Sequence, residues 1–185
     1  MRLVFKFAPE AYPETSLKLK VEINTREHES LYGIKYYPFE IDSRWCQAKT
    51  EILSFEPEEL FGTKLRALLQ RRKNRDLFDL HEGLKQLSMD PDKLIACFVH
   101  YLALEGKPIS RAVAEQRMLE KLSRSLIQDV TPLLPASSRF NDADALEAFD
   151  NIWTDLIARI KGDPWKLSKQ VIDNLRKEKM PNLLR

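Results

Sequence analysis

The segment Phe55–Leu80, FEPEELFGTKLRALLQRRKNRDLFDL, contains the change of periodicity that decides the fold. Before it, apolar residues alternate with the period of two that is typical of strands. Within it, they begin to recur with the 3.6-residue period of a helix. The run Glu56–Glu59 supplies the proline and the acidic side chains that favour a first helical turn. The sequence therefore predicts an α+β fold, with a small N-terminal β-sheet over residues 1–55 and a helical bundle over residues 56–185.

Four short strands are expected before the change of period. In the run Leu17–Ile23 the apolar side chains share one face, and Lys18, Lys20 and Glu22 share the other. Pro38 indicates that the third strand lies at an edge or carries a bulge, because proline cannot donate to a ladder. The predicted strands cover residues 3–7, 17–23, 34–41 and 52–55.

The helices after Phe55 have recognisable start signals. Asp90, Ser110 and Asn141 each stand where an N-cap is expected. Gly162 is expected to end one helix, and Asp163 with the proline that follows it to begin a final, basic helix. The apolar stripe of the first helix is predicted to consist of Leu60, Phe61, Leu65, Leu68 and Leu69.

The composition excludes several classes of protein. Thirty Lys and Arg against 28 Asp and Glu leave a net charge of +2, so any anion site must come from local clustering. No two of the five glycines lie within twenty residues of each other, which excludes a P-loop and a dinucleotide-binding fingerprint. Two cysteines cannot form a disulfide framework or a structural zinc site.

The hydrophobic runs are short. The longest, Leu94–Val99, is far below the roughly 18 residues that a membrane span needs. Charged Arg2 and Lys6 interrupt the opening apolar residues, unlike a signal peptide. We therefore expect a soluble, cytoplasmic protein without a membrane partner.

Lys64 is the first candidate functional residue. It lies four residues after Leu60 and four before Leu68, and therefore along the apolar row of its helix. An ammonium group at that position must reach water, meet a carboxylate or meet a bound anion.

Lys64 also begins a strongly basic stretch. Residues 64–75 contain six positive charges and no acid. Such a local field suits phosphate groups, and it makes Arg66, Arg71 and Arg75 candidates for nucleotide binding. The alternative is a solvated loop between two helices.

Three carboxylates are further candidates. Asp76 and Asp79 have i, i+3 spacing in the first turns of the next helix, where they could cap it, form a charge network or supply a general base. Glu22, on the polar face of its strand, could bind magnesium or could be solvated.

Together these residues resemble a known family. The segment Phe55–Leu80 is similar to the paired C-terminal motifs of the AbiEii-type abortive-infection nucleotidyltransferase toxins, a Glu-rich helix start ending in Lys and an Arg-Asp-x-x-Asp-Leu motif. The upstream run Leu17–Glu27, LKLKVEINTRE, is similar to the strand that bears the third acidic position of the family. The resemblance implies that residues 1–55 are a partial nucleotidyltransferase sheet and that residues 56–185 are a helical domain carrying both motifs.

The resemblance also implies a reaction and a set of roles. The reaction is transfer of a nucleotide from an NTP to RNA, commonly the 3′ end of a tRNA. Lys64 would contact the triphosphate, Asp79 would act in catalysis, and Arg75 and Asp76 would shape the same site. Glu22 would be the outer member of the carboxylate set that holds Mg²⁺. An antitoxin protein is the implied partner.

Two expected elements of the family are absent. The family has a Gly-Ser loop followed by an Asp-x-Asp pair that holds the magnesium. Here no Gly-Ser occurs, and the pairs Asp90/Asp92 and Asp142/Asp144 fall at predicted helix starts. We therefore expect the chain to correspond to the C-terminal part of the enzyme, through truncation, a split gene or a misassigned start. We also expect it to lack transferase activity alone.

Two further hypotheses concern partners. A non-catalytic helical module could bind RNA or protein at two places. One is the basic loop between the first two predicted helices, residues 71–75, and the other is residues 166–185, which hold six basic residues and two acids. An open edge of the N-terminal sheet would also favour self-association through the strands, because unpaired backbone groups invite another chain.

Overall fold

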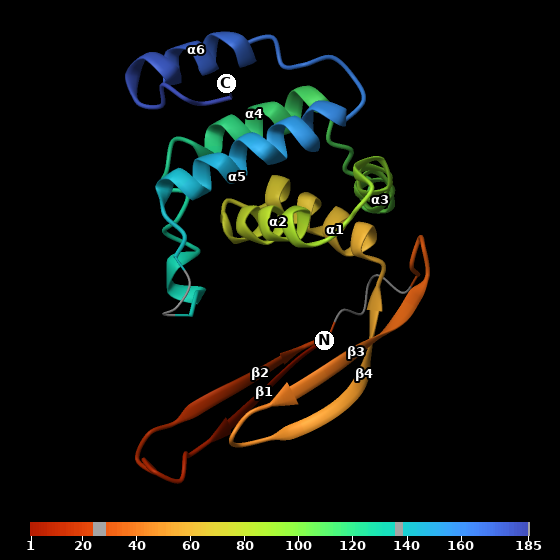
Figure 1. The fold of residues 1–185 in the computed structure, drawn as a ribbon, viewed down its shortest axis with the longest axis vertical. Helices are drawn as coiled ribbons and strands as arrows, with labels where there is room; N and C mark the ends of the chain where they lie inside the picture. The colour runs from red at the N-terminus through yellow and green to blue at the C-terminus, as the bar shows by residue number, and fades with distance from the viewer. Residues whose placement is uncertain (24–28, 136–138, 185) are drawn as a thin grey trace.

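The computed structural model describes residues 1–23, 29–135 and 139–184 and has the predicted α+β architecture (Figure 1). All the strands precede all the α-helices. The strands are β1 (Arg2–Phe7), β2 (Leu17–Glu22), β3 (Ile34–Asp42) and β4 (Gln47–Phe55). The α-helices are α1 (Pro57–Gln70), α2 (Arg75–Gln86), α3 (Pro91–Leu104), α4 (Arg111–Lys121), α5 (Asp142–Asp155) and α6 (Ser168–Glu178).

The strands form two separate antiparallel hairpins, β1–β2 and β3–β4, where a single small sheet was predicted. Strand β4 begins at Gln47, five residues before the predicted start, because its polar first half pairs through the backbone with β3. Backbone pairing does not require the apolar alternation on which the prediction relied. The last residues of the run Leu17–Glu27, residues 24–27, lie outside the described part of the chain.

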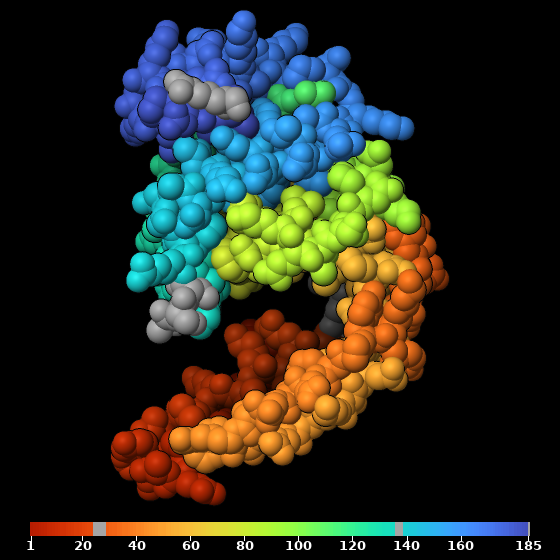
Figure 2. All heavy atoms as spheres, in the orientation of Figure 1, coloured from red at the N-terminus to blue at the C-terminus, as the bar shows by residue number. Residues whose placement is uncertain are grey.

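The register of the first hairpin gathers its apolar residues on one face. Leu3 lies opposite Val21, and Phe5 lies opposite Leu19. This face remains exposed, with 52% of Phe5 and 53% of Leu19 accessible. The hairpins extend away from the helices and leave an open hollow beside the helical part (Figure 2).

The N-cap predictions for the middle helices are confirmed. The side chains of Asp90, Ser110 and Asn141 accept backbone hydrogen bonds at the starts of α3, α4 and α5. The prediction that this helix ends at Gly162 is wrong, because α5 already ends at Asp155 and a short 3-10 turn follows.

The predicted start of the last helix is also wrong. Helix α6 begins at Ser168, after Asp163 and its proline. Glu115 of α4 accounts for the later start of α6, because its carboxylate accepts hydrogen bonds from the Trp165 backbone N–H at 3.0 Å and from the Ser168 hydroxyl at 2.5 Å. These bonds hold the preceding turn against α4.

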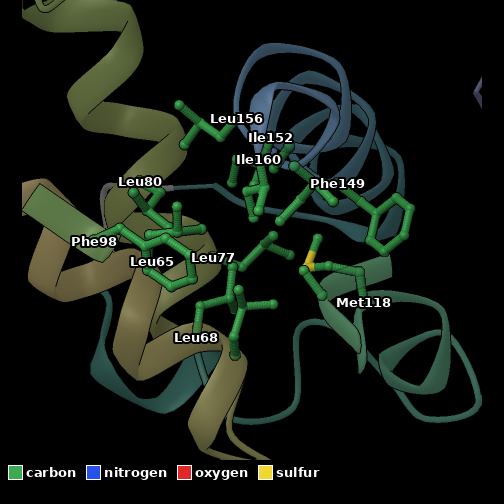
Figure 3. Packing of buried hydrophobic residues seen from close by; sticks show 14 of the residues in the cluster. Leu65, Leu68, Leu77, Leu80, Phe98, Met118, Phe149, Ile152, Leu156 and Ile160 are labelled. Carbon is green, nitrogen blue, oxygen red and sulfur yellow. The ribbon is translucent and has the colours of Figure 1, made fainter. Parts of the chain in front are cut away.

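The hydrophobic core lies among the helices (Figure 3). Leu65 and Leu68 of α1 are fully buried as predicted, whereas Leu60 is 38% exposed. Gly62 allows α1 to lie close to α3: a Cβ atom there would come within 2.7 Å of the Cys97 Cβ. Among the described residues, no helix is both long and apolar enough to cross a membrane.

A buried carboxylate connects the strand region to the helices. Glu59, in the first turn of α1, accepts hydrogen bonds from the Ser30 hydroxyl at 2.7 Å and from the backbone N–H groups of Leu31 and Tyr32 at 2.8 and 2.9 Å. The hydroxyl of Tyr101 on α3 also donates to it. Burial raises the pKa of Glu59, but these hydrogen bonds outweigh burial and lower it below its ordinary value.

The substitution Glu59→Gln is expected to loosen this connection. The amide NH₂ would face groups that are themselves donors, and we expect a loss of about 2 kcal/mol in the free energy of unfolding. Because the folded-state pKa is lowered, the wild-type advantage should be present at neutral pH and should disappear as the pH falls below the ordinary carboxyl range. Urea unfolding and hydrogen exchange of residues 29–34 measure both effects.

The matched control is Glu51→Gln on exposed strand β4. It should leave stability and exchange unchanged. Equal stability of the Glu59→Gln variant and the wild type would contradict this account of the connection.

Candidate functional site

Lys64 of α1 and two carboxylates of α2 meet at one place. The Lys64 Nζ lies 2.5 Å from Asp79 Oδ2 and 3.9 Å from Asp76 Oδ1. The side chains of Lys64 and Asp79 are 36% and 37% exposed, so a ligand can reach the pair from solvent. Of the three options for the ammonium, the structure therefore shows the carboxylate partner. This Lys64 cluster consists of Lys64, Asp76 and Asp79.

Asp76 is the buried member of the Lys64 cluster. Its side chain is 3% exposed, and its Oδ2 accepts no hydrogen bond within the described part of the chain. The Nη1 of Arg71 lies 4.0 Å from this oxygen. The N-cap of α2 is Asn74, so neither aspartate is the cap of this helix. The two aspartates form a charge network with Lys64 and Arg71. Asp76 also lies in the first turn of α2, where a negative charge is favourable.

Lys121 of α4 is a functional candidate that the sequence analysis missed. Its Nζ donates to the carbonyl oxygens of Arg71 and Lys73 at 2.9 and 3.3 Å, and it lies 3.4 Å from Asn74 Oδ1. It therefore fixes the basic loop between α1 and α2. The available signal was its position at the C-terminal end of α4, directly before the buried Leu122, but its partners lie some fifty residues earlier.

The burial of Lys121 changes its acidity. Burial lowers its pKa to about 8, with Arg124 contributing in the same direction and with Asp76 and Asp129 opposing the shift. The protonated ammonium of Lys121 therefore lowers the free energy of unfolding.

The remaining predicted residues lie elsewhere. Arg66 faces α3, where its guanidinium pairs with Glu105 at 3.1 Å and lies over the Tyr101 ring. Arg75 is exposed at the start of α2. Glu22 is 66% exposed and pairs with Arg2 inside the first hairpin. The structure thus brings Lys64, Asp76, Asp79 and Arg71 together, and it does not join Arg66 or Glu22 to them.

The carboxylates of the Lys64 cluster do not by themselves fit a protein-held Mg²⁺. Magnesium requires several oxygen ligands in near-octahedral geometry. No cluster of three or more His, Cys, Asp or Glu side chains that could hold a metal occurs among the described residues. Asp76 and Asp79 are already compensated by Lys64 and Arg71, whose positive charges disfavour a cation at the same place.

The class of protein follows from a comparison of the sequence with known families. A family model described as "Nucleotidyl transferase AbiEii toxin, Type IV TA system" matches residues 2–166. The class is thus that of nucleotidyltransferase-like toxins of toxin–antitoxin systems. The chain belongs to the AbiEii family. Comparisons with curated proteins and with solved structures gave no match.

The variant Lys121→Met tests the electrostatics of the buried ammonium. A lysine whose pKa is lower in the folded than in the unfolded state destabilises the fold while it is protonated. The wild-type free energy of unfolding should therefore gain a contribution as the pH rises from about 8 toward the ordinary lysine value of about 10.4. Urea unfolding at neutral and alkaline pH should show this gain in the wild type and not in Lys121→Met.

The matched control is Lys85→Met, which changes a half-exposed lysine of α2. It should retain the wild-type pH dependence. The assignment fails if Lys121→Met and the wild type gain equal stability between the two pH values.

Proposed function

We propose that the chain carries the Lys64–Asp79 part of a nucleotidyl-transfer site that acts on an NTP and an RNA acceptor. The observation that carries the proposal is the ion pair between Lys64 and Asp79, from two helices, at a place that solvent reaches. Membership of the AbiEii family supports nucleotidyl transfer as the chemistry and an antitoxin protein as the partner.

The proposed roles follow from the charges of the reaction. An acceptor hydroxyl attacks the α-phosphorus of the NTP, the bond to the leaving phosphate breaks, and pyrophosphate departs. Lys64 would neutralise negative charge on the triphosphate, and Arg71 and Arg75 would supply further positive charge at the edge of the site. The carboxylate of Asp79 would accept the proton of the attacking hydroxyl. By family resemblance, the acceptor is the 3′ end of a tRNA.

The substitution Lys64→Gln should weaken NTP binding at least about tenfold, because a charge-assisted contact to phosphate is replaced by a neutral one. Titration of the chain with a fluorescent NTP measures the effect. The control Lys93→Gln changes an exposed lysine of α3 and should bind the NTP like the wild type. Equal affinity of the Lys64→Gln variant and the wild type would remove Lys64 from the site.

A second expectation concerns activity. The two Asp-x-Asp pairs lie at helix starts: Asp90 and Asp92 at α3, and Asp142 and Asp144 at α5. We therefore propose that the chain alone transfers no nucleotide. Incubation with labelled NTPs, magnesium and tRNA should leave the RNA unlabelled, and robust magnesium-dependent labelling would show this to be wrong.

The alternative is a non-catalytic helical module that binds RNA or protein. The cations around the α1–α2 loop favour it, since they would attract an anion without any chemistry. Unchanged NTP binding in Lys64→Gln, together with RNA binding by the wild type, would favour this alternative.

A further inference from the structure

We propose that a pocket between α1 and α4 binds the phosphodiester backbone of RNA, beside the Lys64 cluster. The pocket has a volume of about 440 Å³. Five cationic side chains line it: Arg71, Arg72, Arg117, Lys121 and Arg124. The RNA assignment rests on the proposed function, whereas the phosphate-binding chemistry rests on the pocket itself.

The end of α4 supplies three of the five cations. Arg117 and Lys121 are four residues apart, so they project from the same face of α4, and Arg124 lies in the turn that follows. Arg117 donates to the Leu69 carbonyl oxygen at 3.1 Å, and Lys121 donates to the Arg71 carbonyl oxygen at 2.9 Å. These two cations are thereby fixed against the C-terminal end of α1 and form the frame of the pocket.

The other cations can serve a ligand. Arg72 and Arg124 are exposed, and within residues 1–23, 29–135 and 139–184 their guanidinium groups form no hydrogen bond or ion pair. Glu120 is the single carboxylate of the lining, and Gln116 already donates a hydrogen bond to it. The lining therefore carries a large excess of positive charge, and guanidinium groups can bind phosphate oxygens in pairs.

The shape of the lining favours a phosphate chain over a nucleobase. Among the described residues, the lining contains no aromatic side chain on which a base could stack. Arg71 belongs to the lining and also lies 4.0 Å from Asp76, which in turn lies 3.9 Å from Lys64. An RNA backbone held in the pocket would thus pass directly beside the proposed transfer site.

The double variant Arg72→Gln/Arg124→Gln tests the proposal. Fluorescence anisotropy measures binding of a labelled single-stranded RNA of about 12 nucleotides between about 50 and 200 mM KCl. We expect binding about tenfold weaker than wild type at the lower salt concentration. Loss of two phosphate contacts should also reduce the slope of log K against log salt by about 1.4.

The matched control removes two exposed lysines of α6, in Lys169→Gln/Lys177→Gln. This variant should bind RNA nearly as tightly as the wild type. Equal affinities and slopes for the wild type and the Arg72→Gln/Arg124→Gln variant would overturn the proposal, as would a larger loss in the α6 control. Thermal unfolding should be alike in all three proteins, because the substituted side chains are exposed.

Two competition arms separate the sources of the anion. Inorganic triphosphate that binds the pocket when RNA does not would assign it to a free polyphosphate and overturn the RNA proposal. Tighter binding of a Glu-rich peptide than of RNA would assign the pocket to an acidic protein and overturn it equally. Because NTP binding by Lys64→Gln is measured separately, failure of the transfer-site proposal is distinguishable from failure of the pocket.

Discussion

The buried carboxylate of Glu59 is the interaction on which the placement of the strands depends. Two-stranded hairpins have little stability of their own in water. The segment before β3 is held to the helices through Glu59, which joins Leu31 and Tyr32 to α1 and to Tyr101 of α3. The carboxylate stays ionised there because the donors around it replace the hydration that it loses. The strand region is therefore attached through a polar contact, and the hydrophobic core plays a smaller part in that attachment.

Helix α1 extends this constraint to the candidate site. Gly62 lets it approach α3 closely, and Leu65 and Leu68 fix its inner face in the core. Lys64 is then directed toward α2, where it pairs with Asp76 and Asp79. A buried carboxylate such as Asp76 requires nearby cations when it lacks hydrogen bonds. Lys64 and Arg71 supply those cations. The loop itself is held against α4 by Lys121, which donates to the carbonyl oxygens of Arg71 and Lys73.

The sequence predicts what local chemistry determines. The caps at Asp90, Ser110 and Asn141 place three helices, because a side-chain acceptor within three residues suffices for each. The convergence of Lys64 and Asp79 is likewise accessible from helical periodicity and the family motifs. The hydrogen bonds of Lys121 to the α1–α2 loop and of Glu115 to the turn before α6 cannot be predicted in this way, because each joins residues about fifty positions apart. Local signals also cannot reveal that Arg66 turns to Glu105.

The ion pair between Lys64 and Asp79 bears on the proposed role of Asp79 as proton acceptor. While Lys64 contacts Asp79 at 2.5 Å, the ammonium occupies the carboxylate oxygen that would accept the proton of an acceptor hydroxyl. Under the proposed function, a triphosphate bound to Lys64 would draw the ammonium away from this partner and leave that oxygen open to the hydroxyl. Under the proposed function, the general base is therefore released by the same event that delivers the nucleotide. An acceptor hydroxyl arriving without an NTP would meet a carboxylate that is still paired.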